Sequence, residues 1–168
     1  MLSGFRLLPA GVQPVDRYEP PLVQCIDAVA RKHDLHYGVA DYWLAKYITA
    51  FSATDLRVVS VTPRLDPFVN FANIEWFLGG VGAKRHDRPI YTFAILGSRT
   101  PAEPGVSPLA LNTLGPPIAV ESCLGYDIHV LPPGSDERIR SQFGQNPRIR
   151  AYYKKRGIPL PPPGDQGR

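Results

Sequence analysis

Residues 35–46, LHYGVADYWLAK, decide the fold because they describe a strand that turns at once into a helix. The run 35–39 predicts the strand. Asp41 predicts the helix start, since its carboxylate can accept hydrogen bonds from the first free N–H groups and suits the positive end of the helix dipole. Tyr42 and Trp43 are then expected at the carboxyl end of the strand, the edge at which open α/β sheets usually bind ligands.

The rest of the chain continues this alternation of strands and helices. From the apolar spacing, the β-branched runs and the prolines, helices are expected over 21–33, 41–52, 68–77 and 135–143, with a helical turn that ends at Gly115. Strands are expected over 35–39, 56–61, 90–96, 118–123 and 126–131, the last two joined by a tight turn at Leu124-Gly125. This order predicts an α/β fold, a three-layer sandwich whose mainly parallel, Rossmann-like sheet ends in an antiparallel hairpin.

The sequence divides into three parts of different composition. Residues 1–20 are predicted to be an extended lead-in, 21–146 a single α/β domain, and 147–168 a basic, proline-rich and mobile tail. The whole chain has a net charge of +4, but the tail holds six basic residues against Asp165 alone. The remaining 146 residues carry 13 basic and 14 acidic side chains. The folded body is thus nearly neutral, which argues only weakly for a polyanionic partner.

The sequence as given shows neither a membrane span nor a secretory signal of its own. It has no apolar run of about 18 residues, and its first residues lack a basic segment followed by a long apolar one. The two cysteines, Cys25 and Cys123, both lie in apolar stretches. Two reduced core thiols and one disulfide therefore both remain open.

Common catalytic signatures are absent from the sequence. The turn after Gly38 places an acid where a phosphate would need bare N–H groups, and the run 79–84, GGVGAK, lacks the Gly-Lys-Ser/Thr of a nucleotide loop. The four histidines and two cysteines do not have the spacing of zinc ligands, and no serine sits in a glycine-flanked elbow. We therefore expect no metal site and no cofactor.

Aromatic and polar side chains cluster near the predicted strand ends. Aromatic faces beside amides and charges are suited to a sugar ring, through contacts with its C–H faces and hydrogen bonds to its hydroxyls. The candidate binding residues are Asp41, Tyr42, Trp43, Lys46, Arg64, Asn70, Asn73 and Trp76. Each also has a structural interpretation: a helix cap for the aspartate, core packing for the tryptophans, and turns or caps for the asparagines.

Five runs within residues 18–132 carry a resemblance to known proteins: 23–27, 38–46, 68–77, 115–117, and 128–130 with Cys123. Together they resemble the C-terminal soluble part of large bacterial polytopic membrane proteins that are glycosyltransferase-like. The resemblance implies that a membrane-spanning part of the same parent protein is a partner and that the domain faces the periplasm. It also favours a Cys25–Cys123 disulfide, which persists in oxidising compartments, and a glycan or lipid-linked sugar as ligand. It implies no catalytic residue.

Three functional hypotheses follow. The leading one is a non-catalytic or accessory extracytoplasmic domain that contacts a glycan near Asp41, Tyr42 and Trp43. The second is a hydrolase or glycosyltransferase in which Asp41 is a general base and Lys46 or Arg64 holds an anionic group. The third, least favoured, is a nucleic-acid-binding module that uses the basic tail, with these residues: Arg148, Arg150, Lys154, Lys155 and Arg156, and Tyr152 and Tyr153 for stacking.

Overall fold

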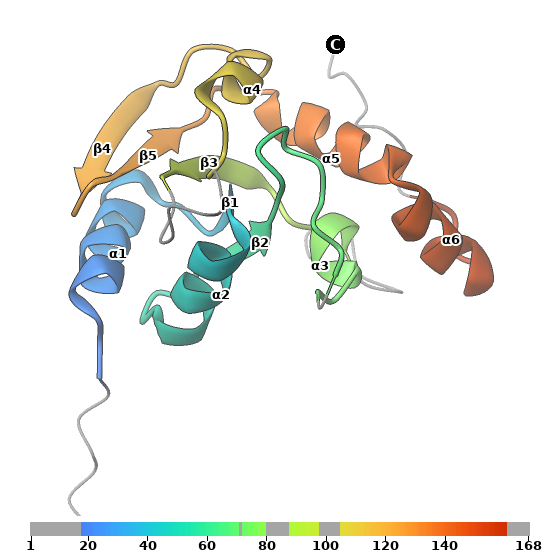
Figure 1. Ribbon diagram of the computed structural model, residues 1–168, viewed down its shortest axis with the longest axis horizontal. Helices are drawn as coiled ribbons and strands as arrows, with labels where there is room; N and C mark the ends of the chain where they lie inside the picture. Colours follow the sequence, from blue (N-terminus) through green and yellow to red (C-terminus); the bar gives the residue numbers. More distant parts are fainter. Residues whose placement is uncertain (1–17, 71, 80–87, 98–104, 161–168) are drawn as a thin grey trace, which may run out of the picture.

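The computed structural model describes residues 18–70, 72–79, 88–97 and 105–160 (Figure 1). Its helices and strands follow one another in this order: α1 Pro21–His33, β1 Tyr37–Ala40, α2 Tyr42–Phe51, β2 Arg57–Ser60, α3 Glu75–Leu78, β3 Tyr91–Leu96, α4 Pro108–Asn112, β4 Ala119–Cys123, β5 Tyr126–Val130, α5 Ser135–Gln145 and α6 Pro147–Lys155. The predicted helices at 21–33, 41–52 and 135–143 are confirmed, as are all five predicted strands to within two residues at either end.

The five strands form one sheet in the order β2-β1-β3-β5-β4. Strand β1 runs parallel to both of its neighbours, whereas β5 runs antiparallel to both of its own. The α/β class and the terminal hairpin are therefore confirmed, and the sheet is mixed. The hairpin turn has positive φ at both central residues, 49° at Leu124 and 87° at Gly125, as a tight two-residue turn requires.

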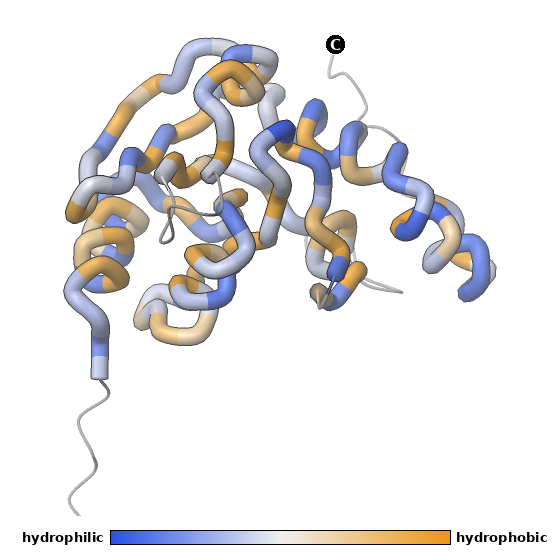
Figure 2. The backbone as a smooth tube through the Cα atoms, in the orientation of Figure 1, coloured by the Kyte–Doolittle hydropathy of each residue, from blue (hydrophilic) through white to orange (hydrophobic). Residues whose placement is uncertain are grey.

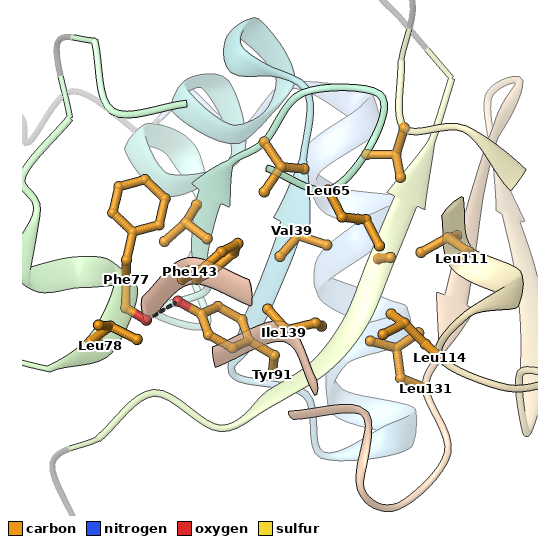
Figure 3. Close-up of a cluster of buried hydrophobic side chains, with 14 of the residues drawn as sticks. Val39, Leu65, Phe77, Leu78, Tyr91, Leu111, Leu114, Leu131, Ile139 and Phe143 are labelled. Atoms are coloured by element: carbon orange, nitrogen blue, oxygen red, sulfur yellow. Dashed lines mark hydrogen bonds between the residues drawn. The ribbon is translucent and has the colours of Figure 1, made fainter. Parts of the chain in front are cut away.

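Two clusters of buried side chains pack against the sheet, and alternate residues of a strand join different clusters. Phe93 and Ile95 of β3 pack with residues of α1 and α2. Ala94 and Leu96 pack with residues of α3, α4, α5 and α6. Figure 3 shows the second cluster, with Tyr91 beside Phe77 and Phe143. Because successive side chains of a strand point to opposite faces, the two clusters meet β3 on opposite faces.

Strand β1 passes close to its neighbour β3 at Gly38. A Cβ built at this position would lie 2.3 Å from the Phe93 ring, a distance that real Cβ atoms do not reach. Glycine is the one residue without a Cβ, so it allows the fully buried Phe93 ring to cover the strand.

Helix α1 is fixed to the hairpin at two points. Cys25 of α1 and Cys123 of β4 form a disulfide with their Cα atoms 5.8 Å apart, a pairing that the residues alone left open. Near the other end of the helix, Glu121 Oε1 accepts hydrogen bonds from Lys32 Nζ at 2.6 Å and His33 Nε2 at 2.8 Å. These two hydrogen bonds lower the pKa of the Glu121 carboxyl.

The predicted helix over 68–77 is wrong for most of its length. Phe68 N–H donates to the Ser60 carbonyl at 2.9 Å, so this residue continues an extended segment beside β2. The helix begins only at Glu75, whose N–H donates to Asn73 Oδ1 at 3.1 Å. Ile74 is the N-cap and makes no side-chain capping bond, whereas Asn73 just before it accepts from the backbone in a turn. The helix therefore begins seven residues later than predicted. Gly79 follows the helix with a φ of 101°, a positive value that glycine adopts readily.

The prediction of a mobile tail is wrong for residues 147–155, which form α6. Asn146 caps this helix by accepting hydrogen bonds from the N–H groups of Arg148 and Ile149, and Pro147 occupies its first turn. Ile149 and Tyr153, four residues apart, are buried in the same cluster as α5. The folded domain therefore continues past residue 146. Helices α5 and α6 both alternate between hydrophilic and hydrophobic residues along their length (Figure 2). The lead-in at 1–17 and the tail at 161–168 lie outside the described residues.

Candidate functional site

A cavity of about 220 Å³ lies between α3 and the amino ends of β1 and β2. Its lining residues are Tyr37, Arg57, Val58, Val59, Asn73, Glu75, Trp76, Gly79 and Pro89. Tyr37 and Arg57 are the first residues of their strands and are register partners. The cavity therefore lies at the amino ends of the parallel strands, whereas the sequence analysis expected the site at their carboxyl ends.

The cavity combines an aromatic surface with a small number of polar groups. Trp76 is 40% exposed, and Tyr37 is half-buried. The amide of Asn73 and the guanidinium of Arg57 are exposed beside them. Valines of β2 provide the apolar part of the lining. An apolar and aromatic lining with a few polar groups that fix orientation is typical of small-molecule binding sites.

Two buried tyrosines hold α3 in place. A helix of only four residues leaves its C-terminal carbonyls without intrahelical partners. Tyr91 Oη donates to the carbonyls of Trp76 at 3.1 Å and Phe77 at 2.9 Å, and the second of these contacts is drawn in Figure 3. Tyr153 Oη of α6 donates to the carbonyl of Gly79. These hydroxyls fix the backbone that carries the Trp76 ring.

Both tyrosines remain donors over the physiological pH range. Burial raises the pKa of Tyr91 well above its ordinary value of 10, and the carboxylate of Asp136 adds to the shift. Burial also raises the pKa of Tyr153 to about 12, with a further contribution from Glu75. A phenol that stays protonated can keep donating to a carbonyl, so the α3 anchor does not titrate near neutral pH.

The carboxylate of Glu75, which also lines the cavity, is bound by α6. Its Oε1 accepts hydrogen bonds from Tyr152 Oη at 2.8 Å and Arg156 Nη1 at 3.0 Å. The Arg156 guanidinium also lies 4.5 Å from the centre of the Tyr152 ring. The pKa of Tyr152 is raised, mainly by burial and next by the hydrogen bond to Glu75. The basic segment that was expected to be a tail thus holds the side chain of a cavity-lining residue, although it does not line the cavity itself.

Lys46 links the predicted aromatic pair to the cavity. Its Nζ lies 5.4 Å from the centre of the Trp76 ring and 5.8 Å from that of Tyr42, both within range of a cation–π contact. Tyr42 in turn contacts the Trp43 ring edge-on, with centroids 5.0 Å apart. Of the predicted residues, Asn73 and Trp76 line the cavity, and Lys46 and Tyr42 do not line it but are linked to the Trp76 ring through the Lys46 ammonium.

The remaining predicted residues do not line this cavity. Asp41 is 4% exposed, and its Oδ1 accepts hydrogen bonds from the N–H groups of Trp43 at 3.0 Å and Leu44 at 3.2 Å, which confirms it as the cap of α2. Trp43 is 51% exposed at the start of α2. The backbone of Arg64 bonds to Thr62 and Gln142, and Asn70 accepts a hydrogen bond from Arg148.

The residues whose place at the site was missed are Tyr37, Arg57, Glu75, Tyr152 and Arg156, the last two having been assigned to nucleic-acid binding. They come from four separate segments, so only the tertiary structure brings them together. One signal was available: Ile149 and Tyr153 repeat at the four-residue spacing of a helix face, which could have identified α6. Of the two tyrosines named for stacking, Tyr153 is buried and Tyr152 donates its hydroxyl hydrogen to Glu75.

Two further properties of the described chain bear on the site. Within residues 18–70, 72–79, 88–97 and 105–160, no three His, Cys, Asp or Glu side chains converge in a way that suits a metal ion. No helix in the same ranges has the length and apolar character needed to cross a bilayer.

Comparisons of the chain with protein-family models, curated proteins and solved structures find no match. The chemistry of the cavity therefore has to carry the functional inference.

Proposed function

We propose that this domain binds a sugar in the cavity at Trp76, as a non-catalytic or accessory part of a bacterial membrane protein. The observation that carries the proposal is the partly exposed Trp76 ring beside the Asn73 amide on the wall of a cavity of about 220 Å³. Pockets for drug-sized ligands measure roughly 300–1,000 Å³, so this one suits a single ring. An indole face packs against sugar C–H groups, while an amide and a guanidinium can bond to hydroxyls.

The extracytoplasmic location and the membrane-spanning partner remain part of this proposal. They rest on the resemblance, and the Cys25–Cys123 disulfide supports them, since such bonds persist in oxidising compartments. A lipid-linked sugar would be the ligand available at a membrane surface. We also propose the finer description of the fold as a three-layer α/β/α sandwich, which the separate buried clusters on the two sheet faces support.

An enzyme with Asp41 as general base is not proposed. A general base must reach the proton that it removes, either directly or through one water. The Asp41 carboxylate is buried and caps α2, and it does not line the cavity. The carboxylate that does line the cavity, Glu75, is bonded to Tyr152 and Arg156. The cavity is thus better equipped to hold a ligand than to transfer protons.

The two tryptophans of the chain allow a matched test. A glycan array probed with the purified, oxidised protein should give signals that Trp76→Ala removes. Trp43→Ala should keep these signals, because Trp43 is at least as exposed as Trp76 but does not line the cavity. Thermal unfolding of both variants would show that they fold. Loss of binding in Trp43→Ala alone, or no glycan binding by the wild type, would contradict the proposal.

A further inference from the structure

Arg57 gives the cavity a positive charge that no described residue neutralises. It is exposed at the start of β2, and its backbone is fixed there because its N–H donates to the His36 carbonyl at 2.9 Å. In the part of the chain that the structure describes, no carboxylate forms an ion pair with Arg57. The guanidinium therefore has its hydrogen-bonding donors available for a ligand.

The one carboxylate on the described cavity wall does not offset Arg57. Glu75 is held by Arg156 at 3.0 Å and by the Tyr152 hydroxyl at 2.8 Å, so its charge is already balanced. A second cation, Lys46, lies 5.4 Å from the centre of the Trp76 ring. Among these charged groups, Arg57 on the cavity wall and Lys46 at the Trp76 ring remain as an excess of positive charge. This excess favours an anionic ligand over a neutral one.

We propose that the cavity selects an acidic sugar, meaning a hexose unit that carries a carboxylate or a phosphate. The sugar ring packs on Trp76, and its anionic group binds the Arg57 guanidinium. Arginine presents a planar fork of N–H donors that matches the oxygens of a carboxylate or a phosphate in a bidentate manner. This inference rests on the proposed sugar-binding function and specifies its ligand class. A uronic acid and a sugar phosphate share the required chemistry.

The two tryptophan indoles provide a direct readout. In ¹H–¹⁵N spectra of the full oxidised chain, the Trp76 indole N–H should shift on titration, and the Trp43 indole serves as an internal reference. The probes are methyl glucoside, glucuronic acid and glucose 1-phosphate, with sodium acetate and sodium phosphate as anions that lack a ring. We expect the acidic sugars to bind about tenfold more tightly than methyl glucoside and than the anions alone.

Substitution of Arg57 tests its role. Arg57→Gln should bring the affinity for acidic sugars down to that for methyl glucoside, while the affinity for methyl glucoside changes less than about twofold. Arg57→Lys keeps the charge but not the fork, so an intermediate preference is expected. Arg64→Gln is the matched control, because Arg64 is also an exposed arginine near β2 but does not line the cavity. It should keep the full preference.

The possible outcomes separate the inference from the function on which it rests. Equal binding of neutral and acidic sugars by the wild type would overturn the inference and leave sugar binding in place. An unchanged preference in Arg57→Gln, or free phosphate binding as tightly as glucose 1-phosphate, would also overturn it. If no sugar shifts the Trp76 indole, the proposed function itself fails. A preference for only one of the two acidic sugars would support the inference and identify the anionic group.

Discussion

Reduction of the Cys25–Cys123 disulfide should cost the domain a large part of its stability. The bond closes a loop with a sequence separation of 98 residues. Chain-entropy estimates give about 4.7 kcal/mol for a loop of roughly this length, and measured values are commonly about 2–4 kcal/mol. In a chain of this size 1 kcal/mol corresponds to roughly 2–4 °C in Tm, so a loss of about 4 kcal/mol lowers Tm by roughly 8–16 °C.

Urea unfolding followed by tryptophan fluorescence would measure this loss. The oxidised protein, the same protein in a phosphine reductant, and the double variant Cys25→Ser/Cys123→Ser should be compared. The double variant should match the reduced protein and should not respond to the reductant. Coincident midpoints for the oxidised and reduced proteins would refute the reasoning, because they would show that the bond does not restrict the unfolded chain. They would also remove the support that the disulfide gives to an oxidising compartment.

Three further substitutions probe local features of the fold. Asp41→Ala removes the α2 cap and should lower the free energy of unfolding, measured by urea titration, by about 1 kcal/mol. Asp41→Asn should keep most of the wild-type stability, because asparagine caps helices about as well as aspartate. Gly38→Ala forces a Cβ against the Phe93 ring and should cost about 1–3 kcal/mol by the same measurement, whereas Gly144→Ala, in open space on α5, should cost nothing. Burial raises the pKa of Tyr153 to about 12 in the folded state, against about 10 for the unfolded chain. Its contribution to stability is therefore complete below pH 10 and is lost as the pH rises through 12, and Tyr153→Phe should flatten this part of the pH–stability curve.

Local signals in the sequence were sufficient for most helices and strands. Helix α1 begins at Pro21, where proline is tolerated, and α2 begins directly after the Asp41 cap. The hairpin was recognisable because two runs with the composition of strands flank the short Leu124-Gly125 turn. In each case the deciding residues lie within a few positions of the element that they define. Such short-range effects can be evaluated without knowledge of the tertiary structure.

The errors concern features that depend on distant residues. Phe68 is extended because its N–H bonds to the Ser60 carbonyl, and the four-residue helix α3 relies on hydroxyls from Tyr91 and Tyr153. The basic residues of α6 suggested a solvated tail, because the only apolar signal against it was the spacing of Ile149 and Tyr153, whose partners lie in the core that α5 helps to form. For the same reason, the site was expected near Asp41, whereas Arg57 and Glu75 were not recognised as cavity residues.

The bond between Cys25 and Cys123 also determines how the domain would respond to a pulling force. Tension applied at residues 18 and 160 would pass along the first turns of α1, across the sulfur–sulfur bond and into the hairpin, α5 and α6. Strands β1, β2 and β3, together with the cavity at their amino ends, lie within the closed loop and outside this load path. Force on a domain tethered at both ends would therefore bypass these strands along the chain and reach the cavity only through α6, whose Tyr153 and Arg156 bond to Gly79 and Glu75.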